Sequence, residues 1–144
     1  MSQEQVELVR RVYADEGNLG VVVNPDDERE VLDRLFREYY LEDFEVRMPP
    51  DYPEGEQVLR GREGMSRLSA MLRDTWSEFR FKAERLLDAG DRVVVLVRVA
   101  EGGVSGIPTE RETAHIWTAR HGRLSSIQIY RDRAEALKAA GLQG

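Results

Sequence analysis

Two side chains of this sequence are the best placed to do chemistry on a bound molecule. His115 lies in an apolar stretch between Ala114 and Ile116, and Arg98 interrupts the aliphatic run from Arg92 to Ala100. Imidazole, with a reference pKa of about 6.5, can act near neutrality as an acid, a base or a hydrogen-bond donor. A guanidinium among apolar side chains needs an anionic partner, such as a ligand carboxylate or enolate. His115 and Arg98 are therefore candidate catalytic residues.

The same side chains also have purely structural interpretations. A neighbouring side chain could hold His115 through a hydrogen bond, and a glutamate such as Glu112 could hold Arg98 in a salt bridge. Asp132 stands three residues before Glu135, which is the pattern of a capping box at the start of the last helix. The Asp132 carboxylate is therefore assigned a structural role.

Length, charge and composition narrow the class of protein. A chain of 144 residues is the size of one domain, so we expect a single domain over residues 1–144. The net charge of -6 argues against a nucleic-acid or anionic-membrane partner, because either would require a basic face. No apolar run approaches the roughly 18 residues of a membrane helix, and the polar start is unlike a signal peptide, so a cytoplasmic location is expected. With no cysteine and only two histidines, neither a metal site nor a cofactor is predicted.

Helical spacing of apolar residues predicts three helices in the first half of the chain. The first runs from about Gln3 to Asp15, behind a capping box that begins at Ser2. The second begins at Asn24 and Pro25, an N-cap followed by a first helical residue. Its buried stripe is Val31, Leu35, Phe36 and Tyr39, and that of the third helix, which opens at Arg60–Gly64, is Met65, Leu68, Leu72 and Trp76.

Strands fill most of the remaining chain. Phe44, Val46 and Met48 alternate with charged residues in a half-buried strand that Pro49 and Pro50 end, and a polar loop, residues 51–57, follows. The period becomes two again from Phe79, and 88–91 has the composition of a turn. Strands are expected at 92–100, at 111–120 and up to 131, with a short helix closing the chain.

The strand 92–100 is apolar on both faces. Val93, Val95, Val97 and Val99 share one face, and Val94, Leu96, Arg98 and Ala100 share the other. The helices of a small domain can cover one face of a sheet, so the second apolar face suggests a homodimer through the outer face of the sheet. The alternative is that this face merely carries scattered exposed valines.

Two hairpins decide which side chains meet. A hairpin centred near Gly106 places Arg98 roughly opposite His115, with both pointing the same way. For the turn Arg120–Gly122 we predict a three-residue loop with a left-handed Gly122, because histidine is a poor first residue for a two-residue primed turn. This register places Ile127 opposite His115, and Ser125 opposite Trp117. The inner face is then Thr113, His115, Trp117, Ile127, Ile129 and Arg131, whereas the rejected register has Gln128 and Tyr130 there.

The chain resembles the SnoaL-like branch of the nuclear transport factor two superfamily, which also contains ketosteroid isomerase and limonene epoxide hydrolase. The resemblance rests on LRGREG at 59–64, on LLDAGDRVVV at 86–95, on Trp117 before the turn at 120–123, and on YRDRAEAL at 130–137. It implies an α+β fold, a cone in which a curved antiparallel sheet wraps around three helices, also described as a SnoaL-like or cystatin-like α+β barrel. It further implies an apolar cavity at the open end and a dimer through the sheet.

The chemistry of ketosteroid isomerase does not transfer to this chain as a whole. That enzyme uses an aspartate base with a tyrosine and a protonated aspartic acid as donors. The position that matches the base is Met48, which cannot move a proton. The acid that donates maps to His115, and the tyrosine falls within a residue of Tyr13. No aspartate or glutamate clearly points inward.

Two hypotheses follow. In the first, the protein binds a small apolar molecule with a carbonyl group and acts by proton transfer through His115 with help from Arg98, as an isomerase, a cyclase or a hydrolase-like enzyme. The pocket residues are then Tyr13, Phe36, Tyr39, Met48, Trp117, Ile127, Ile129 and Arg131, although aromatic residues at these spacings are usually core. In the second, it is a noncatalytic dimeric binding or scaffold module. An open cavity of roughly 300 Å³ or more, with both side chains exposed to it, favours a ligand site.

Overall fold

The computed structural model describes residues 2–15, 18–22, 24–50, 58–103 and 109–142. In chain order these form α1 (Ser2–Asp15), a short 3-10 turn (Pro25–Asp27), α2 (Glu28–Glu38), β1 (Tyr40–Arg47), β2 (Val58–Arg60), α3 (Gly61–Thr75), β3 (Trp76–Asp88), β4 (Arg92–Gly103), β5 (Thr109–Arg120), β6 (Arg123–Tyr130) and α4 (Arg133–Ala139). The predicted helices and main strands are present, but Trp76, expected in the third helix, is the first residue of β3, and the three-residue β2 was not expected. The predicted loop at 51–57 and the hairpin tip near Gly106 lie outside the described residues.

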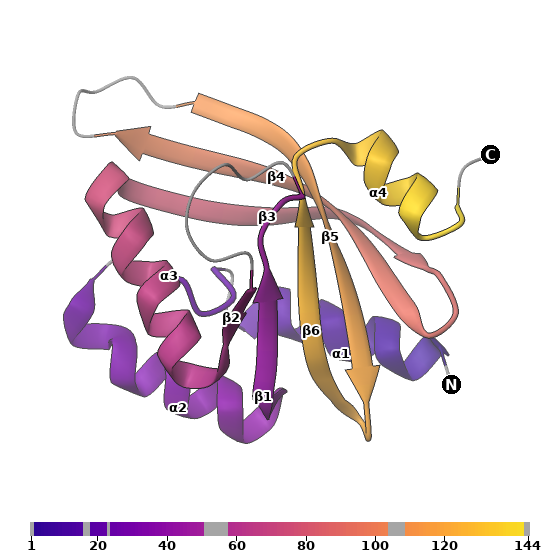
Figure 1. Ribbon diagram of the computed structural model, residues 1–144, viewed down its shortest axis with the longest axis horizontal. Helices are drawn as coiled ribbons and strands as arrows, with labels where there is room; N and C mark the ends of the chain where they lie inside the picture. The colour runs from indigo at the N-terminus through magenta and orange to yellow at the C-terminus, as the bar shows by residue number, and fades with distance from the viewer. Residues whose placement is uncertain (1, 16–17, 23, 51–57, 104–108, 143–144) are drawn as a thin grey trace.

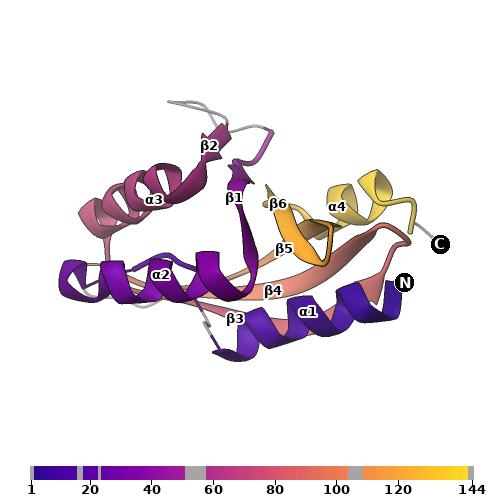
Figure 2. The ribbon, with the colours of Figure 1, turned by 90° about the horizontal axis from the view of Figure 1, so that it is seen from below.

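The six strands form one curved sheet in the order β2-β1-β6-β5-β4-β3. Figure 1 shows the long strands β3 to β5 sweeping across the molecule, and Figure 2 shows α1 and α4 on opposite sides of them. All neighbouring strands are antiparallel except β1 and β6, which are parallel. The predicted α+β cone is confirmed, with the correction that its sheet is mixed, because β1 enters the sheet beside the last strand of the chain.

The caps predicted at Asn24 and Asp132 formed, although Asn24 caps a 3-10 turn and α2 itself begins at Glu28. The Asn24 side chain accepts a hydrogen bond from the Asp26 backbone N–H, with Pro25 at the first position of the 3-10 turn that leads into α2. The Asp132 carboxylate accepts one from the Ala134 N–H at 2.8 Å. Short polar side chains satisfy orphan N–H groups at these helix starts, so the Asp132 acid is structural.

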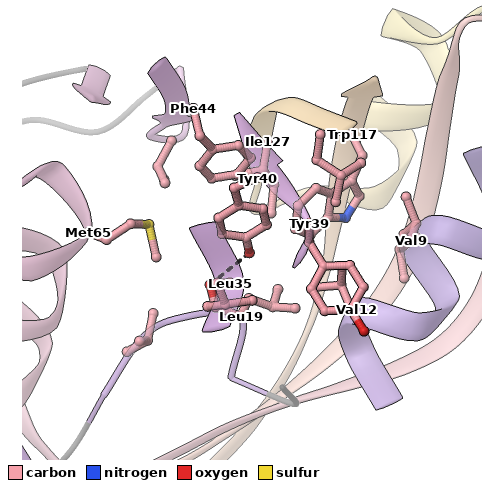
Figure 3. Packing of buried hydrophobic residues seen from close by; sticks show 14 of the residues in the cluster. Val9, Val12, Leu19, Leu35, Tyr39, Tyr40, Phe44, Met65, Trp117 and Ile127 are labelled. Carbon is pink, nitrogen blue, oxygen red and sulfur yellow. Dashed lines mark hydrogen bonds between the residues drawn. The ribbon is translucent and has the colours of Figure 1, made fainter. Parts of the chain in front are cut away.

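The core lies between the inner face of the sheet and α1 to α3. It contains the odd-numbered valines of β4, with Val9 and Val12 of α1 and an aromatic group from β1 and β5. Tyr40 and Phe44 stack with ring centroids 3.9 Å apart, and Trp117 packs beside both. Figure 3 shows Tyr40 and Phe44 side by side, with Met65 of α3 on one side and Trp117 and Val9 of α1 on the other. Burial of these large rings supplies much of the stability of the fold and fixes β1 against β5 and β6.

The outer face of the sheet has its own apolar cluster. Val94, Ala114 and Ile116 are buried together with Ala136 and Ala140, which α4 brings to this face. α4 thus covers part of the surface on which a second subunit was expected. The sequence pattern of the closing helix does not indicate on which face of the sheet it packs. The homodimer stays a prediction, and the second apolar face is no longer its main support.

The β5–β6 hairpin differs from the predicted register by two residues. Arg120 pairs with Arg123, so the connection is a two-residue turn in which His121 (φ 56°) and Gly122 (φ 75°) are both left-handed. An irregularity after Thr118 then shifts the ladder by one residue. His115 therefore pairs with Ile129 and Trp117 with Ile127, rather than His115 with Ile127 and Trp117 with Ser125. An even shift keeps the same side chains inside, so the predicted inner face is confirmed although its pairing was wrong.

Gly64 gives a test of how closely α3 packs on β2. A Cβ at this position would lie 2.6 Å from the carbonyl carbon of Leu59, at a φ that any residue can adopt. Alanine usually stabilises a helix interior relative to glycine, by roughly 0.5–1 kcal/mol. Here we expect Gly64→Ala to destabilise the protein by about 1–3 kcal/mol, because backbone atoms have to move. Urea unfolding measures the change, and a gain in stability would show that the contact between α3 and β2 is loose.

Candidate functional site

A cavity of about 170 Å³ opens between the inner face of the sheet, the end of β1 and α3. Most of its wall is apolar: Val21, Met48, Pro49, Leu68, Leu72, Phe79, Phe81, Val99 and Ile129. A second space of about 20 Å³ lies beside it, and His115, Phe81 and Ile129 line both. The larger volume is below the roughly 300 Å³ of typical ligand pockets and close to the roughly 150 Å³ of a cavity that holds benzene. The cavity suits a molecule of about one ring.

The polar groups of the cavity all come from one wall. Arg111, Thr113 and His115 occupy alternate positions of β5, and Arg131 follows the end of β6. Alternation along a strand sends the β5 side chains to the same inner face, across the cavity from Leu68 and Leu72 of α3. A ligand in this cavity would meet apolar contacts on one side and hydrogen-bond donors on the other.

His115 is the most deeply placed of these polar residues, and Tyr13 of α1 holds its ring. The side chain of His115 is 1% exposed. Trp117 Nε1–H donates to the Tyr13 hydroxyl oxygen at 2.9 Å, and that hydroxyl lies 2.6 Å from His115 Nδ1. If Nδ1–H donated to the hydroxyl instead, the hydroxyl proton would have no acceptor among the hydrogen bonds described, so we assign the hydroxyl as the donor to Nδ1. Three side chains from α1 and β5 thus form one hydrogen-bonded chain.

This arrangement fixes the protonation of His115. With Nδ1 accepting, the neutral imidazole has its proton on Nε2, which is buried and has no partner among the described residues. Burial lowers the pKa of His115 to about 3, because the charged imidazolium is poorly solvated there. Burial likewise raises the pKa of Tyr13 well above its usual value, so the phenol keeps its proton. The pKa of His115 therefore lies far below the reference value on which the sequence expectation rested, and the neutral ring carries a buried Nε2–H.

Arg98 does not belong to this site. It pairs with Glu112 in the β4–β5 ladder, and His115 pairs with Val95, so the two side chains lie on opposite faces of the sheet. On the outer face Arg98 contacts Glu84 at 3.1 Å and Glu112 at 3.3 Å. The prediction that Arg98 faces His115 was wrong because the actual register differs by an odd number of residues. The alternative salt bridge to Glu112 is the observed one.

The other predicted pocket residues divide into three groups. Met48, Ile129 and Arg131 line the larger cavity, Trp117 and Ile127 line the smaller one, and Tyr13 lies behind His115. Phe36 and Tyr39 line neither and were wrongly placed in the pocket. Phe36 packs edge-to-face on Tyr40, and the Tyr39 hydroxyl donates to Asp15 of α1. Burial and that hydrogen bond raise the pKa of Tyr39 to about 12.

A buried carboxylate near the cavity was missed by the sequence analysis. Glu101 is 2% exposed, and its Oε1 accepts from Arg111 Nε at 2.5 Å and from Arg111 Nη2. Glu101 lies in β4 and pairs with Phe79 of β3, which lines the cavity. The sequence could have revealed it, because Glu101 continues the alternation by which Val97 and Val99 point to the inner face of the sheet. The statement that no acid points inward is therefore corrected.

Two further properties concern only the residues that the structure describes. Among them, no group of three or more histidine, aspartate or glutamate side chains could hold a metal ion. None of their helices is both long enough and apolar enough to cross a membrane.

Comparisons with known proteins agree with this geometry. The family model described as SnoaL-like domain matches residues 26–127. Among solved structures, an NTF2-like protein of unknown function from Burkholderia pseudomallei is 19% identical, with a TM-score of 0.67 over 94% of this chain and 95% of that chain. A putative SnoaL-like polyketide cyclase from Jannaschia sp. CCS1 is 21% identical, with a TM-score of 0.66 over 99% and 94%.

A third solved structure contains a small molecule. TerC, co-crystallised with polyporic acid, is 18% identical, with a TM-score of 0.67 over 96% of this chain and 98% of that chain. No curated protein matches the chain. Identities this low establish a common fold and do not transfer a substrate or a reaction.

Proposed function

Because this chain belongs to the SnoaL-like domain family, we propose that it binds a small, mostly apolar molecule bearing a carbonyl group, in the cavity at the open end of its cone. One observation carries the proposal: His115 lines the cavity and has a buried Nε2–H without a protein partner in the described residues. A buried donor left unpaired costs about 1–3 kcal/mol, which a ligand oxygen would recover. The apolar wall opposite accommodates the body of the ligand.

His115 acts in this proposal as a neutral hydrogen-bond donor. Tyr13 holds Nδ1 and thereby keeps the proton on Nε2, and the low pKa of His115 keeps the ring uncharged at neutral pH. A neutral imidazole can polarise a carbonyl oxygen without giving up its proton. Proton transfer through His115, the first hypothesis from the sequence, is therefore not part of the proposal.

Binding is proposed rather than turnover because the described cavity wall has no base. An isomerase or cyclase that works by enolisation needs a group to remove a proton beside the carbonyl. Met48 occupies the position of the base implied by the resemblance, and the buried acid Glu101 is engaged by Arg111. The geometry supports the second sequence hypothesis, a noncatalytic binding module, whose dimeric state is a separate proposal.

The proposal is tested with two probes of nearly equal shape. Acetophenone and isopropylbenzene differ chiefly in that only the first has an oxygen. We expect acetophenone to bind about three- to tenfold more tightly, the ratio that one neutral hydrogen bond provides. Calorimetric titration measures both dissociation constants. In His115→Leu this preference should fall to about one, because the Nε2–H donor is gone.

Arg98→Ala is the matched control, since Arg98 lies on the outer face and contacts only side chains there among the interactions described. It should keep the preference for acetophenone. A preference that survives in His115→Leu, or the absence of any preference in the wild type, would overturn the assignment of His115 as the carbonyl donor. Because the test compares two ligands in the same variant, a general loss of stability does not imitate the result.

A further inference from the structure

We propose that the ligand is a single-ring carboxylic acid, whose carboxylate binds Arg111 at the mouth of the cavity while an oxygen at its other end accepts from His115. The inference rests on the proposed function and narrows its class of ligand. Its basis is the position of Arg111, the way in which Glu101 holds it, and the size of the cavity.

Arg111 lies on the same inner row as His115. It pairs with Val99 across the β4–β5 ladder, and both residues line the cavity. Half of the Arg111 side chain, 51%, is exposed, which places it at the mouth, whereas His115 is buried. Four residues along a strand separate their Cα atoms by about 13 Å. The two donors therefore mark the shallow and deep ends of one site.

Glu101 holds the Arg111 guanidinium in place. A single carboxylate oxygen, Oε1, accepts from both Nε and Nη2 of Arg111. A buried carboxylate is costly unless it is paired, so Glu101 binds this edge of the guanidinium strongly. Arg111 has five N–H donors, of which the described residues take two. The remaining donors are fixed in position without a described protein acceptor, which is the arrangement that binds a carboxylate with little loss of side-chain freedom.

The charges around the cavity favour an anion over a neutral or cationic group. Of the described residues that line it, Arg111 and Arg131 are cationic and none is acidic. The polar row lies along the sheet, and Leu68 and Leu72 of α3 lie across the cavity from it. A flat apolar ring with a carboxylate at one end and an oxygen at the other matches this distribution, and the volume of about 170 Å³ limits it to about one ring.

The competing explanation is that Arg111 serves only to neutralise Glu101. The two explanations differ in one measurable quantity, the gain in affinity when a carboxylate is added to a neutral ligand. The probes are acetophenone and 4-acetylbenzoate, which present the same ketone to His115. We expect 4-acetylbenzoate to bind about tenfold or more tightly in low salt, as a hydrogen bond to a charged group provides. Since Arg111 is half-exposed, the gain should shrink in higher salt.

The main variant is the double substitution Glu101→Gln with Arg111→Gln. Arg111→Gln alone would leave a buried carboxylate unpaired and would endanger folding, whereas the double variant removes both charges. Within this variant 4-acetylbenzoate should bind no more tightly than acetophenone, so that the carboxylate gain is lost. His115→Leu, in contrast, should keep the carboxylate gain and lose the preference for a ketone.

Each outcome decides between the explanations. A gain that disappears in the double variant supports the inference. If 4-acetylbenzoate binds no better than acetophenone in the wild type, or if the gain persists in the double variant, the inference is wrong. The proposed function still stands in both cases, provided that the ketone preference depends on His115. If neither probe binds, the proposed function fails and the inference fails with it.

Discussion

Lowering the pH from 7 to 3 is expected to reduce the free energy of unfolding by about 4 kcal/mol through His115 alone. The pKa of His115 is about 3 in the folded protein and about 6.5 in the unfolded chain. Between these values the unfolded state binds a proton that the folded state does not bind, so stability is complete above pH 6.5 and is lost as the pH falls. The slope reaches about 1.4 kcal/mol per pH unit. For a domain whose total stability is typically about 5–15 kcal/mol, this is a large effect.

The measurement is urea unfolding at a series of pH values, for the wild type and for His115→Gln. Carboxylates whose pKa values are lowered by arginine contacts, such as Glu45 and Glu84, also lose stability in acid, but they contribute equally to both proteins. The difference between the two stabilities therefore isolates His115. It should be constant above about pH 7 and should change steadily below. A difference that stays flat down to pH 4 would mean that the buried imidazole is solvated and titrates normally.

The inner row of β5 was predictable because a strand places alternate side chains on one face. Thr113, His115 and Trp117 were assigned to the inside by alternation alone, and the structure has them there. The predicted β5–β6 pairing was wrong by two residues, but the assignment of side chains to the inner face stayed correct because an even shift preserves the face. Alternation in a single strand is thus a local property that needs no knowledge of the partner strand.

For Arg98, alternation within one strand was not enough to predict on which face of the sheet the side chain lies. Its face relative to His115 depends on the register of β4 against β5, and the predicted pairing differs from the observed one by three residues. An odd shift moves a side chain to the other face of the sheet. The connection between the two strands is long, and no turn residue within it fixed the register. One error in a long hairpin was therefore enough to place a surface arginine inside the cavity.

The contact between Tyr13 and His115 joins residues 102 positions apart in the sequence. It depends on how α1 lies across the sheet, which no local pattern specifies. The resemblance to a family placed a tyrosine within a residue of Tyr13, but the direction of its hydroxyl and the partner it meets come from packing. The missed Glu101 is a different case, because extending the alternation of β4 by one more step would have found it.

Tyr13→Phe is expected to destabilise the protein by about 2–6 kcal/mol while leaving the core almost as full. The substitution removes only the hydroxyl, so the ring contacts with His115 and Trp117 are kept. It leaves two buried groups without partners, the Trp117 Nε1–H donor and the His115 Nδ1 acceptor, and each costs about 1–3 kcal/mol. Urea unfolding at pH 7 measures the loss. Tyr40→Phe is the matched control: the Tyr40 hydroxyl donates to the backbone carbonyl of Leu19, and its removal leaves the bonds of Tyr13 to His115 and Trp117 in place.

The same substitution tests whether Tyr13 sets the tautomer of His115. In the wild type the hydroxyl donates to Nδ1, so nitrogen-15 spectra should show one neutral form protonated at Nε2. Without that donor neither ring nitrogen is specified, and both tautomers should be populated. The preference for acetophenone over isopropylbenzene should then fall in proportion, because only the Nε2–H form can donate into the cavity. A Tyr13→Phe protein with a single unchanged tautomer would show instead that the cavity itself, and not Tyr13, orients the imidazole for its ligand.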